Sequence, residues 1–413
     1  MIETILLLIV CIPIFLLGNI IYSKSINPIN IFVGINLISI LLPLLLNEFE
    51  GYSIRNTLSF VVMFVSFTLG VVICSQKGNK ISKYSYIRSS DLYKLIIFSS
   101  IIYDIALVFY LQNMFSNYSL TQFFLEMDEV NKYVQSDEFH GRLYSYVVPM
   151  GLPLSLIILY YSKHFKNSIF LWIQYFVCFL HCISPRRSEL FNMFIVTIIY
   201  LICTNDYFKK RLSIKQFSFI GISVFIFIFV MEYTQNLMGK SSGDDIYLLS
   251  YKLPHFLNDV FIYLSLNYPY IETMDYSELT SCSTIFSSTF RLIYIYINPF
   301  LGNIIDTREQ FDLDFLNIGG PYTTNTAPII YYAYKDLGDF YFIDFIFLGY
   351  ISHKAYLYLL SPGIFNRIFG SLIYCMLFLS SRSYLLIFLI VVLYFLYTYL
   401  FSKLVKLSRW KLS

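Results

Sequence analysis

The sequence predicts an all-α protein, a polytopic transmembrane bundle in which residues 1–413 form one integral-membrane domain. Of the 413 residues, 57% are hydrophobic and only 13% are charged. Several apolar runs reach the ~20 residues that a helix needs to cross ~30 Å of hydrocarbon. Because these runs are continuous and do not alternate with polar residues, they exclude a membrane β-barrel.

About eleven transmembrane spans follow from the apolar runs. We expect them at residues 2–22, 29–47, 57–75, 93–113, 145–162, 169–184, 188–204, 214–231, 337–352, 366–380 and 384–401. The first run carries Glu3 and no basic segment ahead of it. It is therefore expected to be a retained span and not a cleaved signal peptide.

Basic residues fix the orientation of these spans, because cytoplasmic segments of membrane proteins are enriched in Lys and Arg. They collect in residues 76–94, in residues 205–216 and in the C-terminal tail. With eleven spans and an outer N-terminus, all three segments lie in the cytoplasm. The smaller inner loops add Lys24, Lys163, Lys166, Lys354 and Arg367.

Two outer loops are large. The first covers residues 114–144, and the main one covers residues 233–335. The main loop contains an apolar stretch at 283–305. An additional span there would turn the basic tail outward, so we expect an interfacial or re-entrant helix instead.

Five arginines of the predicted outer face lie in tight hairpins or close to predicted membrane boundaries, against the usual charge distribution. They are Arg142, Arg186, Arg187, Arg291 and Arg382. Two tight hairpins, "SPRRSEL" and "FLSSRSYLL", each place Arg between serines and between two apolar helices. A guanidinium stays charged and binds phosphate through two parallel hydrogen bonds. We therefore predict that these arginines bind a diphosphate at the membrane surface; the alternative is that each reaches outer-leaflet lipid phosphates.

The segment "GGPYTTNTAPIIYYAYKDLG" (319–338) predicts a second anion site. Thr326 followed by Pro328 is typical of a helix start, with Thr or Asn as the cap and Pro in the first turn. Free N–H groups at such an end attract anions. We predict that Thr324, Asn325 and Thr326 contribute to substrate binding; the alternative is an ordinary capped helix packed on the bundle.

Six residues on the outer side are candidate proton acceptors: His140, Glu232, His255, Asp259, Asp336 and Asp339. Asp336 and Asp339 are three residues apart, which predicts one helical face at the top of the ninth span. Partial desolvation there would tune a carboxylate toward base function. Alternatively, either carboxylate pairs with Arg and orients it. Asp104, deep in the fourth span, is expected to have a buried partner.

No metal or cofactor is expected. The "DLD" sequence at 312–314 has the D-x-D form of many sugar transferases, but it falls on the wrong face for nucleotide sugars. The chain lacks G-x-x-x-x-G-K-[ST], H-E-x-x-H and G-x-S-x-G. ATPase, zincin and common hydrolase functions therefore have no support, and neither has nucleic-acid binding.

The spans, the late outer loop, "SPRRSEL" and "NTAPIIYYAYKDLG" together resemble O-antigen polymerases of the Wzy type over most of the chain. Arg–x10–Gly patterns, found in outer loops of some members, occur at Arg291–Gly302 and Arg308–Gly319. The first outer loop departs from this pattern, because Pro153 is the eleventh residue after Arg142.

The resemblance implies a bacterial inner-membrane glycosyltransferase of the GT-C type, with its active site and both large loops in the periplasm. Such an enzyme moves a growing glycan from undecaprenyl diphosphate onto the sugar of an incoming lipid-linked repeat unit. Its substrates would be undecaprenyl-diphosphate-linked oligosaccharides among membrane lipids. A Wzz-type chain-length regulator and a Wzx-type flippase are candidate partners.

The chemistry agrees with this expectation. Arginine can stabilise the developing charge of a diphosphate leaving group without a metal. The acceptor hydroxyl needs a base, for which we nominate Asp336 first and His140 second.

Two alternatives stay open. An O-antigen ligase shares the architecture and the donor but differs in its acceptor. A lipid-linked oligosaccharide flippase, or a more distant transporter, would show two equivalent halves with cations in a central cavity, whereas this chain has asymmetric loops and few charges within spans.

Overall fold

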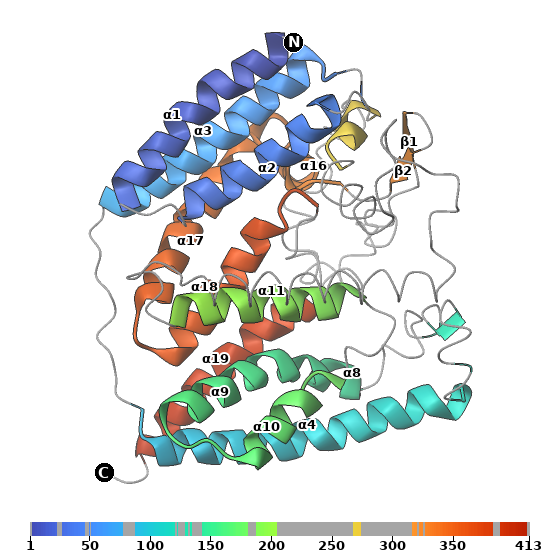
Figure 1. The fold of residues 1–413 in the computed structure, drawn as a ribbon, viewed down its shortest axis with the longest axis vertical. Coiled ribbons are helices and arrows are strands. Elements are labelled where there is room, and N and C mark those ends of the chain that lie inside the picture. The colour runs from blue at the N-terminus through green and yellow to red at the C-terminus, as the bar shows by residue number, and fades with distance from the viewer. Residues whose placement is uncertain are drawn as a thin grey trace, which may run out of the picture. The chain divides into compact units, whose positions relative to one another are not determined.

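Figure 1 shows the computed structural model of the chain. The described residues are 2–22, 27–45, 49, 51–76, 87–119, 122, 129–130, 133, 143–180, 187–204, 267–273, 316–319, 322–324, 327–382 and 389–410. The chain divides into two compact units. Unit 1 comprises residues 1–80, 245–356 and 376–389, and unit 2 comprises residues 81–244, 357–375 and 390–413.

Unit 1 begins with three apolar helices that lie side by side, α1 (Ile2–Tyr22), α2 (Pro28–Leu45) and α3 (Ile54–Gln76) (Figure 1). Its later part contains the 3-10 turn η3 (Pro269–Thr273), the strands β1 (Leu316–Gly319) and β2 (Tyr322–Thr324), α16 (Ile329–Leu337), the 3-10 turn η5 (Gly338–Phe340) and most of α17 (Phe342–Leu360). Buried aromatic side chains fill the space between α2, α3 and α17, with the rings of Phe32 and Phe67 stacked at 4.1 Å.

Unit 2 is built from α4 (Ser89–Asn117), α8 (Leu143–Val147), the 3-10 turn η1 (Val148–Met150), α9 (Gly151–His164), α10 (Ile169–Val177), α11 (Arg187–Thr204), most of α18 (Ile364–Phe378) and α19 (Leu389–Trp410). The long helix α4 packs against α8 and α9, and α10 packs against α9. Asp104 of α4 accepts a hydrogen bond from Nε2 of the buried Gln174 at 2.8 Å, which confirms the expected partner.

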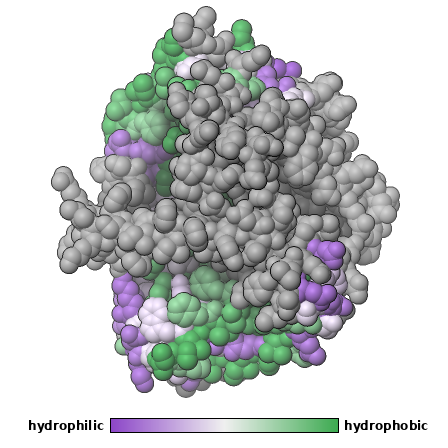
Figure 2. All heavy atoms as spheres, turned by 45° about the vertical axis from the view of Figure 1, so that its right-hand side comes forward, coloured by the Kyte–Doolittle hydropathy of each residue, from purple (hydrophilic) through white to green (hydrophobic). Residues whose placement is uncertain are grey.

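Five helical segments among the described residues are long and apolar enough to cross a membrane. They are Thr4–Tyr22, Pro28–Leu45, Ile54–Gln76, Ser89–Asn117 and Leu143–His164. Large apolar side chains remain exposed on one stripe of α4, at Ile101, Ile105 and Val108. Figure 2 shows broad hydrophobic areas on the described surface. A surface of this kind is suited to lipid.

Helices α1 to α4 lie where the first four spans were predicted. The fifth predicted span is divided into α8, η1 and α9, because Pro149 falls in the 3-10 turn. The helix of the sixth predicted span, α10, ends at Val177, and the structure describes this region only to residue 180. The predicted span 214–231 and the stretch 283–305 lie outside the described residues.

The ninth predicted span, 337–352, coincides with α17 over most of its length, but α17 begins five residues later and ends eight residues later than predicted. Helix α16 ends at Leu337, Gly338 has φ of 55°, and α17 starts at Phe342 and continues to Leu360. A positive φ is accessible to glycine and interrupts a right-handed helix. The apolar run therefore forms two helices, and the second reaches eight residues beyond the predicted end.

A small hairpin departs from the predicted all-α fold. Strands β1 and β2 pair antiparallel, with Leu316 opposite Thr324 and an irregularity between Asn317 and Gly319. The hairpin falls inside the predicted main outer loop, residues 233–335. The residues of β2, Tyr322 to Thr324, are of types that favour strands.

Two glycines allow α3 and α17 to cross at close range in unit 1. A Cβ atom at Gly70 would overlap the backbone carbonyl of Ile346, and one at Gly349 would overlap the carbonyl of Phe67. Small residues at such a crossing let two helix backbones approach directly, which is a common way to pack helices in membranes.

Replacing Gly70 or Gly349 by alanine should destabilise unit 1. Extra atoms forced into a close contact cost ~1–3 kcal/mol, so we expect a lower midpoint of thermal unfolding in detergent, measured by fluorescence-detected size exclusion. Gly34→Ala is the matched control, because its new Cβ would lie 3.6 Å from the Phe15 ring, an ordinary contact distance. Equal midpoints for Gly70→Ala and this control would contradict the close crossing.

Candidate functional site

The described part of the chain contains only some of the predicted site residues. Arg382 and Asp336 are described with their side chains. The backbones of Arg187, the first residue of α11, and Thr324, the last residue of β2, are also described. Arg142, His140, Arg186, Arg291, Asn325 and Thr326 lie outside the described residues, as do Glu232, His255 and Asp259. The site can therefore be built around Arg382 and α16.

The turn that carries Arg382 follows the end of α18. Its backbone closes through hydrogen bonds from Ser380 N–H to the carbonyl of Leu377 at 3.3 Å and from Arg382 N–H to the carbonyl of Leu379 at 3.0 Å. Ser380 and Ser381 are buried, whereas Arg382 is half-buried. The turn thus holds its serines inside the unit and places the arginine at the edge.

Ser380 connects this turn to two other elements of unit 1. Its carbonyl oxygen accepts a hydrogen bond from the Ile329 N–H at 2.9 Å, at the start of α16. Its hydroxyl accepts from Nδ2 of Asn36, on α2, at 2.8 Å and donates to the carbonyl of Leu377 at 2.7 Å. The structure therefore brings together two segments that were predicted separately, the Arg382 hairpin and the start of α16.

The predicted helix start at Thr326 is corrected by this contact. Helix α16 begins at Ile329, its cap residue is Pro328, and no side chain caps it. Proline has no side-chain acceptor, and its extended backbone at ψ 166° turns the chain into the helix. The N–H of Ile329 already has Ser380 as its acceptor. That N–H is consequently unavailable to an anion.

Asn36 extends the contact to the turn η3. Its Oδ1 accepts a hydrogen bond from the Tyr268 hydroxyl at 2.5 Å, and its Nδ2 also donates to the carbonyl of Phe32 at 2.7 Å. Burial raises the pKa of Tyr268 well above its usual value, so the phenol stays neutral and can donate. One buried amide thus joins α2, η3 and the Arg382 turn.

The Arg382 turn lies at the depth of Asn36, which is near the middle of α2. Nine residues separate Asn36 from the end of α2 at Leu45, which corresponds to ~13 Å along the helix axis. The turn is therefore recessed from the C-terminal end of α2.

Glu272 fixes the other end of η3 on the start of α3. Its Oε1 accepts hydrogen bonds from the Ser53 N–H at 2.7 Å, the Ser53 hydroxyl at 3.2 Å and Nδ2 of Asn56 at 2.5 Å. A carboxylate is favourable here because the N-terminus of a helix carries partial positive charge. The turn η3 thereby spans from the first turn of α3 to the middle of α2.

Tyrosines attach α16 to α3. The Tyr334 hydroxyl lies 2.6 Å from the hydroxyl of Ser59, and its ring stacks on Tyr341 at 4.1 Å. Tyr331 contacts Tyr270 of η3 edge to face, with centroids 6.1 Å apart. Burial, followed by the neighbouring Tyr270, raises the pKa of Tyr331, so this phenol also stays neutral. The packing leaves α16 little freedom to shift along α3.

Lys335 is a cation that the sequence analysis missed. Its Nζ lies 5.7 Å from the centroid of the Tyr331 ring. Cation–π contacts of this kind hold a charged group above an aromatic face. Lys335 falls in a segment that was predicted to be outer, so its position against the positive-inside tendency was the signal that could have identified it.

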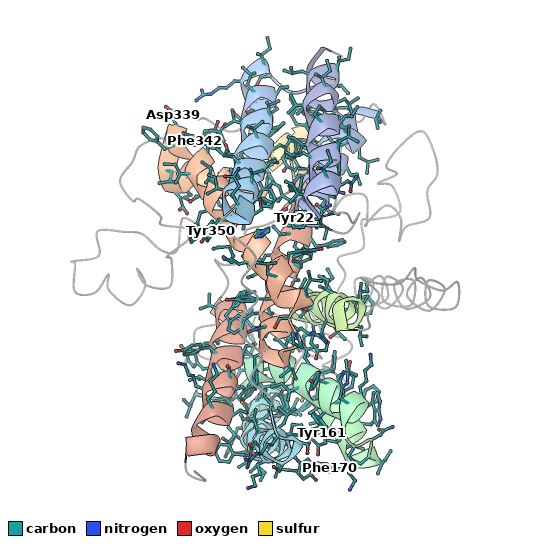
Figure 3. All side chains as sticks on the ribbon, turned by 90° about the vertical axis from the view of Figure 1, so that its left-hand side faces the viewer. Tyr22, Tyr161, Phe170, Asp339, Phe342 and Tyr350 are labelled. Atoms are coloured by element: carbon teal, nitrogen blue, oxygen red, sulfur yellow. The ribbon has the colours of Figure 1, made fainter. Side chains whose placement is uncertain are left out.

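The two candidate carboxylates on this segment have different surroundings. Asp336, in α16, is 3% exposed, whereas Asp339, in η5, is exposed. Figure 3 labels Asp339 next to Phe342, at the start of α17. The prediction of one shared helical face is wrong, because Gly338 ends α16 between them. The burial of Asp336 favours the alternative role, in which this carboxylate pairs with an arginine and orients it.

No family model, no curated protein and no solved structure matches this chain. The candidate site therefore stands on its own geometry. That geometry comprises a recessed arginine turn, a buried amide at its base and an aromatic helix beside it.

Asn36→Leu should destabilise unit 1, because the variant leaves the Tyr268 hydroxyl buried without its acceptor. A buried polar group that loses its partner costs ~1–3 kcal/mol. We expect a lower unfolding midpoint in detergent than for Thr68→Val, the control. The Thr68 hydroxyl bonds the carbonyl of Phe64 in its own helix, so its loss separates no elements. A smaller effect of Asn36→Leu than of the control would contradict the connecting role.

Proposed function

We propose that this chain polymerises undecaprenyl-diphosphate-linked O-antigen repeat units at the periplasmic face of the bacterial inner membrane. In this reaction the growing glycan leaves one lipid diphosphate and is joined to a sugar hydroxyl of the next lipid-linked unit. The enzyme is a metal-independent glycosyltransferase of the GT-C type. Chain-length regulators of the Wzz type and flippases of the Wzx type are its proposed partners.

The observation that carries the proposal is the recessed turn of Arg382 beside α16. Four hydrogen bonds of Ser380, one each with Asn36 and Ile329 and two with Leu377, fix this turn. A cation held inside the apolar part of a membrane protein is costly, and such residues commonly serve function. We propose that the diphosphate of a lipid-linked substrate reaches this turn from the membrane.

The proposed chemistry uses charge stabilisation. Arg382, with Arg186, Arg187, Arg291 and Arg142, binds the diphosphate and stabilises the charge that develops as it leaves. Preorganised donors of this kind are worth most where water is excluded. Asp336 stays the first candidate for proton transfer from the acceptor hydroxyl, either directly or by orienting a neighbour, and His140 the second. Residues 324–326 are proposed to contact the glycan.

Arg382→Gln should abolish long O-antigen while leaving lipopolysaccharide that carries a single repeat. Loss of one preorganised donor slows a reaction ~100- to 1,000-fold, so the ladder seen by gel electrophoresis of lipopolysaccharide should collapse. Arg186→Ala and Arg187→Ala should give the same result. Lys354→Gln, which removes a predicted inner cation of unit 1, is the control and should keep the ladder.

The same gels distinguish the proposed function from its rivals. Loss of even the single-repeat form in a deletion strain would indicate a ligase or a flippase and would contradict the polymerase assignment. A full ladder in Arg382→Gln, with the variant present at normal abundance, would remove Arg382 from the site.

Asp336→Asn and Asp339→Asn form a matched pair on one segment. If Asp336 transfers or orients a proton, its amide variant should lose most of the polymer, whereas Asp339→Asn should resemble the parent because the side chain is exposed. The measurement is the same ladder, normalised to the amount of monodisperse protein after purification. Equal ladders for the two variants would exclude Asp336 from the reaction.

A further inference from the structure

Asp104 places an acidic side chain in the middle of the long apolar helix α4, one of the helices able to cross a membrane. It lies fifteen residues after Ser89 and thirteen residues before Asn117, which corresponds to ~20 Å from either end of the helix. Between Lys94 and Asn117 it is the only charged residue of the sequence. Since the hydrocarbon extends only ~15 Å on each side of its centre, a membrane that α4 crosses surrounds Asp104 with apolar material.

Two neighbouring residues of α4 hold α10 beside it. The Tyr103 hydroxyl donates to the carbonyl oxygens of Val177 at 3.3 Å and Cys178 at 3.1 Å. Asp104 accepts its hydrogen bond from Nε2 of Gln174 at 2.8 Å. A single amide donor does not neutralise a carboxylate. Within the described part of the chain no basic side chain forms an ion pair with Asp104, so its charge is not compensated there.

The carboxylate is partly exposed on an apolar surface. Asp104 is half-buried, and Ile101 and Val108, one helical turn before and after it, are 55% and 62% exposed. Residues three and four positions apart share one face of a helix. On the neighbouring helix α10, Phe170 is exposed one turn before Gln174. Apolar side chains therefore surround a single, partly accessible negative charge.

Lipid alone is an unfavourable neighbour for this surface, because ionisable residues within spans commonly pair with an opposite charge. Phospholipid headgroups do not reach the middle of the bilayer. A metal ion needs several oxygen ligands, and the described residues include no group of three acidic, histidine or cysteine side chains that could hold one. A second copy of the chain, paired along α4 by two-fold symmetry, would bring two Asp104 carboxylates together, which is also unfavourable.

We propose that this surface of α4 beside α10 binds a transmembrane helix of another protein, one that carries a lysine or arginine near its middle. The cation pairs with Asp104, whose carboxylate Gln174 holds in position. The side chains of Ile101, Val108 and Phe170 pack against the apolar part of the bound helix. The surface belongs to unit 2, and the inference does not rest on the proposed function.

The test is the association of synthetic transmembrane peptides with the purified full-length protein in phosphatidylcholine vesicles. The leucine-rich peptides are identical except for one central residue, which is lysine, leucine or glutamate, and each carries a dansyl acceptor. Trp172 of α10 is the fluorescence donor, and the second of the two tryptophans is removed by Trp410→Phe. We expect saturable energy transfer to the lysine peptide and only unsaturable background with the other two.

Variants of the full chain separate the charge of Asp104 from its structural role. Asp104→Asn keeps an acceptor for Gln174 and removes the charge, so association with the lysine peptide should weaken at least ~10-fold, the effect of losing one charge-assisted contact. Gln174→Leu removes the internal hydrogen bond and keeps the charge, so it should bind this peptide at least as strongly as the parent. Lys94→Gln, which changes an exposed charge elsewhere on α4, is the matched control and should bind like the parent.

Four outcomes would overturn the proposal. Equal association of the lysine and leucine peptides with the parent would remove the role of charge, and this comparison needs no variant at Asp104. Equal losses in Asp104→Asn and Gln174→Leu would assign Asp104 a purely structural role between α4 and α10. Unchanged binding by Asp104→Asn would show that the peptide binds elsewhere. A dimer of the chain that dissociates in Asp104→Asn, counted by single-molecule photobleaching, would identify a second copy as the occupant.

Discussion

The part of unit 1 around the start of α16 depends on the hydrogen bonds that satisfy the polar groups of Ser380. In an apolar surrounding each backbone or hydroxyl group needs a partner inside the protein, because water is absent. Ser380 meets this need by bonding to α2, to α16 and to the preceding helix α18. Since these partners come from distant parts of the chain, one residue sets the relative positions of three segments. Arg382 follows two residues later, so its location is a consequence of the same constraint.

The aromatic composition has a structural role in this arrangement. Tyr268 and Tyr334 each combine a buried ring with a hydroxyl that finds a polar partner, Asn36 and Ser59 respectively. Such residues fill space like phenylalanine and also satisfy polar atoms. They connect the later segments η3 and α16 to α2 and α3. The abundance of tyrosine, 38 residues, is therefore partly explained by this mode of packing.

Continuous apolar runs sufficed to predict α1 to α4, because length and hydrophobicity decide a simple span. The apolar runs did not predict the break between α16 and α17 at Gly338. The apolar pattern continues through this residue, and only its local backbone conformation interrupts the helix. The contact between Asn36 and Ser380 joins residues 344 positions apart. Neither segment has a sequence pattern from which this pairing could be predicted. Arg382 could be identified as an unusual outer cation. Three further features could be learned only from the fold. They are the recessed position of the Arg382 turn, the buried residues that support it, and the hydrogen bond that occupies the start of α16.

The close crossing of α3 and α17 restricts where unit 1 can rearrange. With backbone against backbone at Gly70 and Gly349, α17 can neither rotate nor slide on α3 without separating from it. Beyond its outer end the chain passes through η5 and Gly338 into α16. Any displacement of α16 would thus bend the chain at Gly338, while the pair of helices α3 and α17 remains a rigid support.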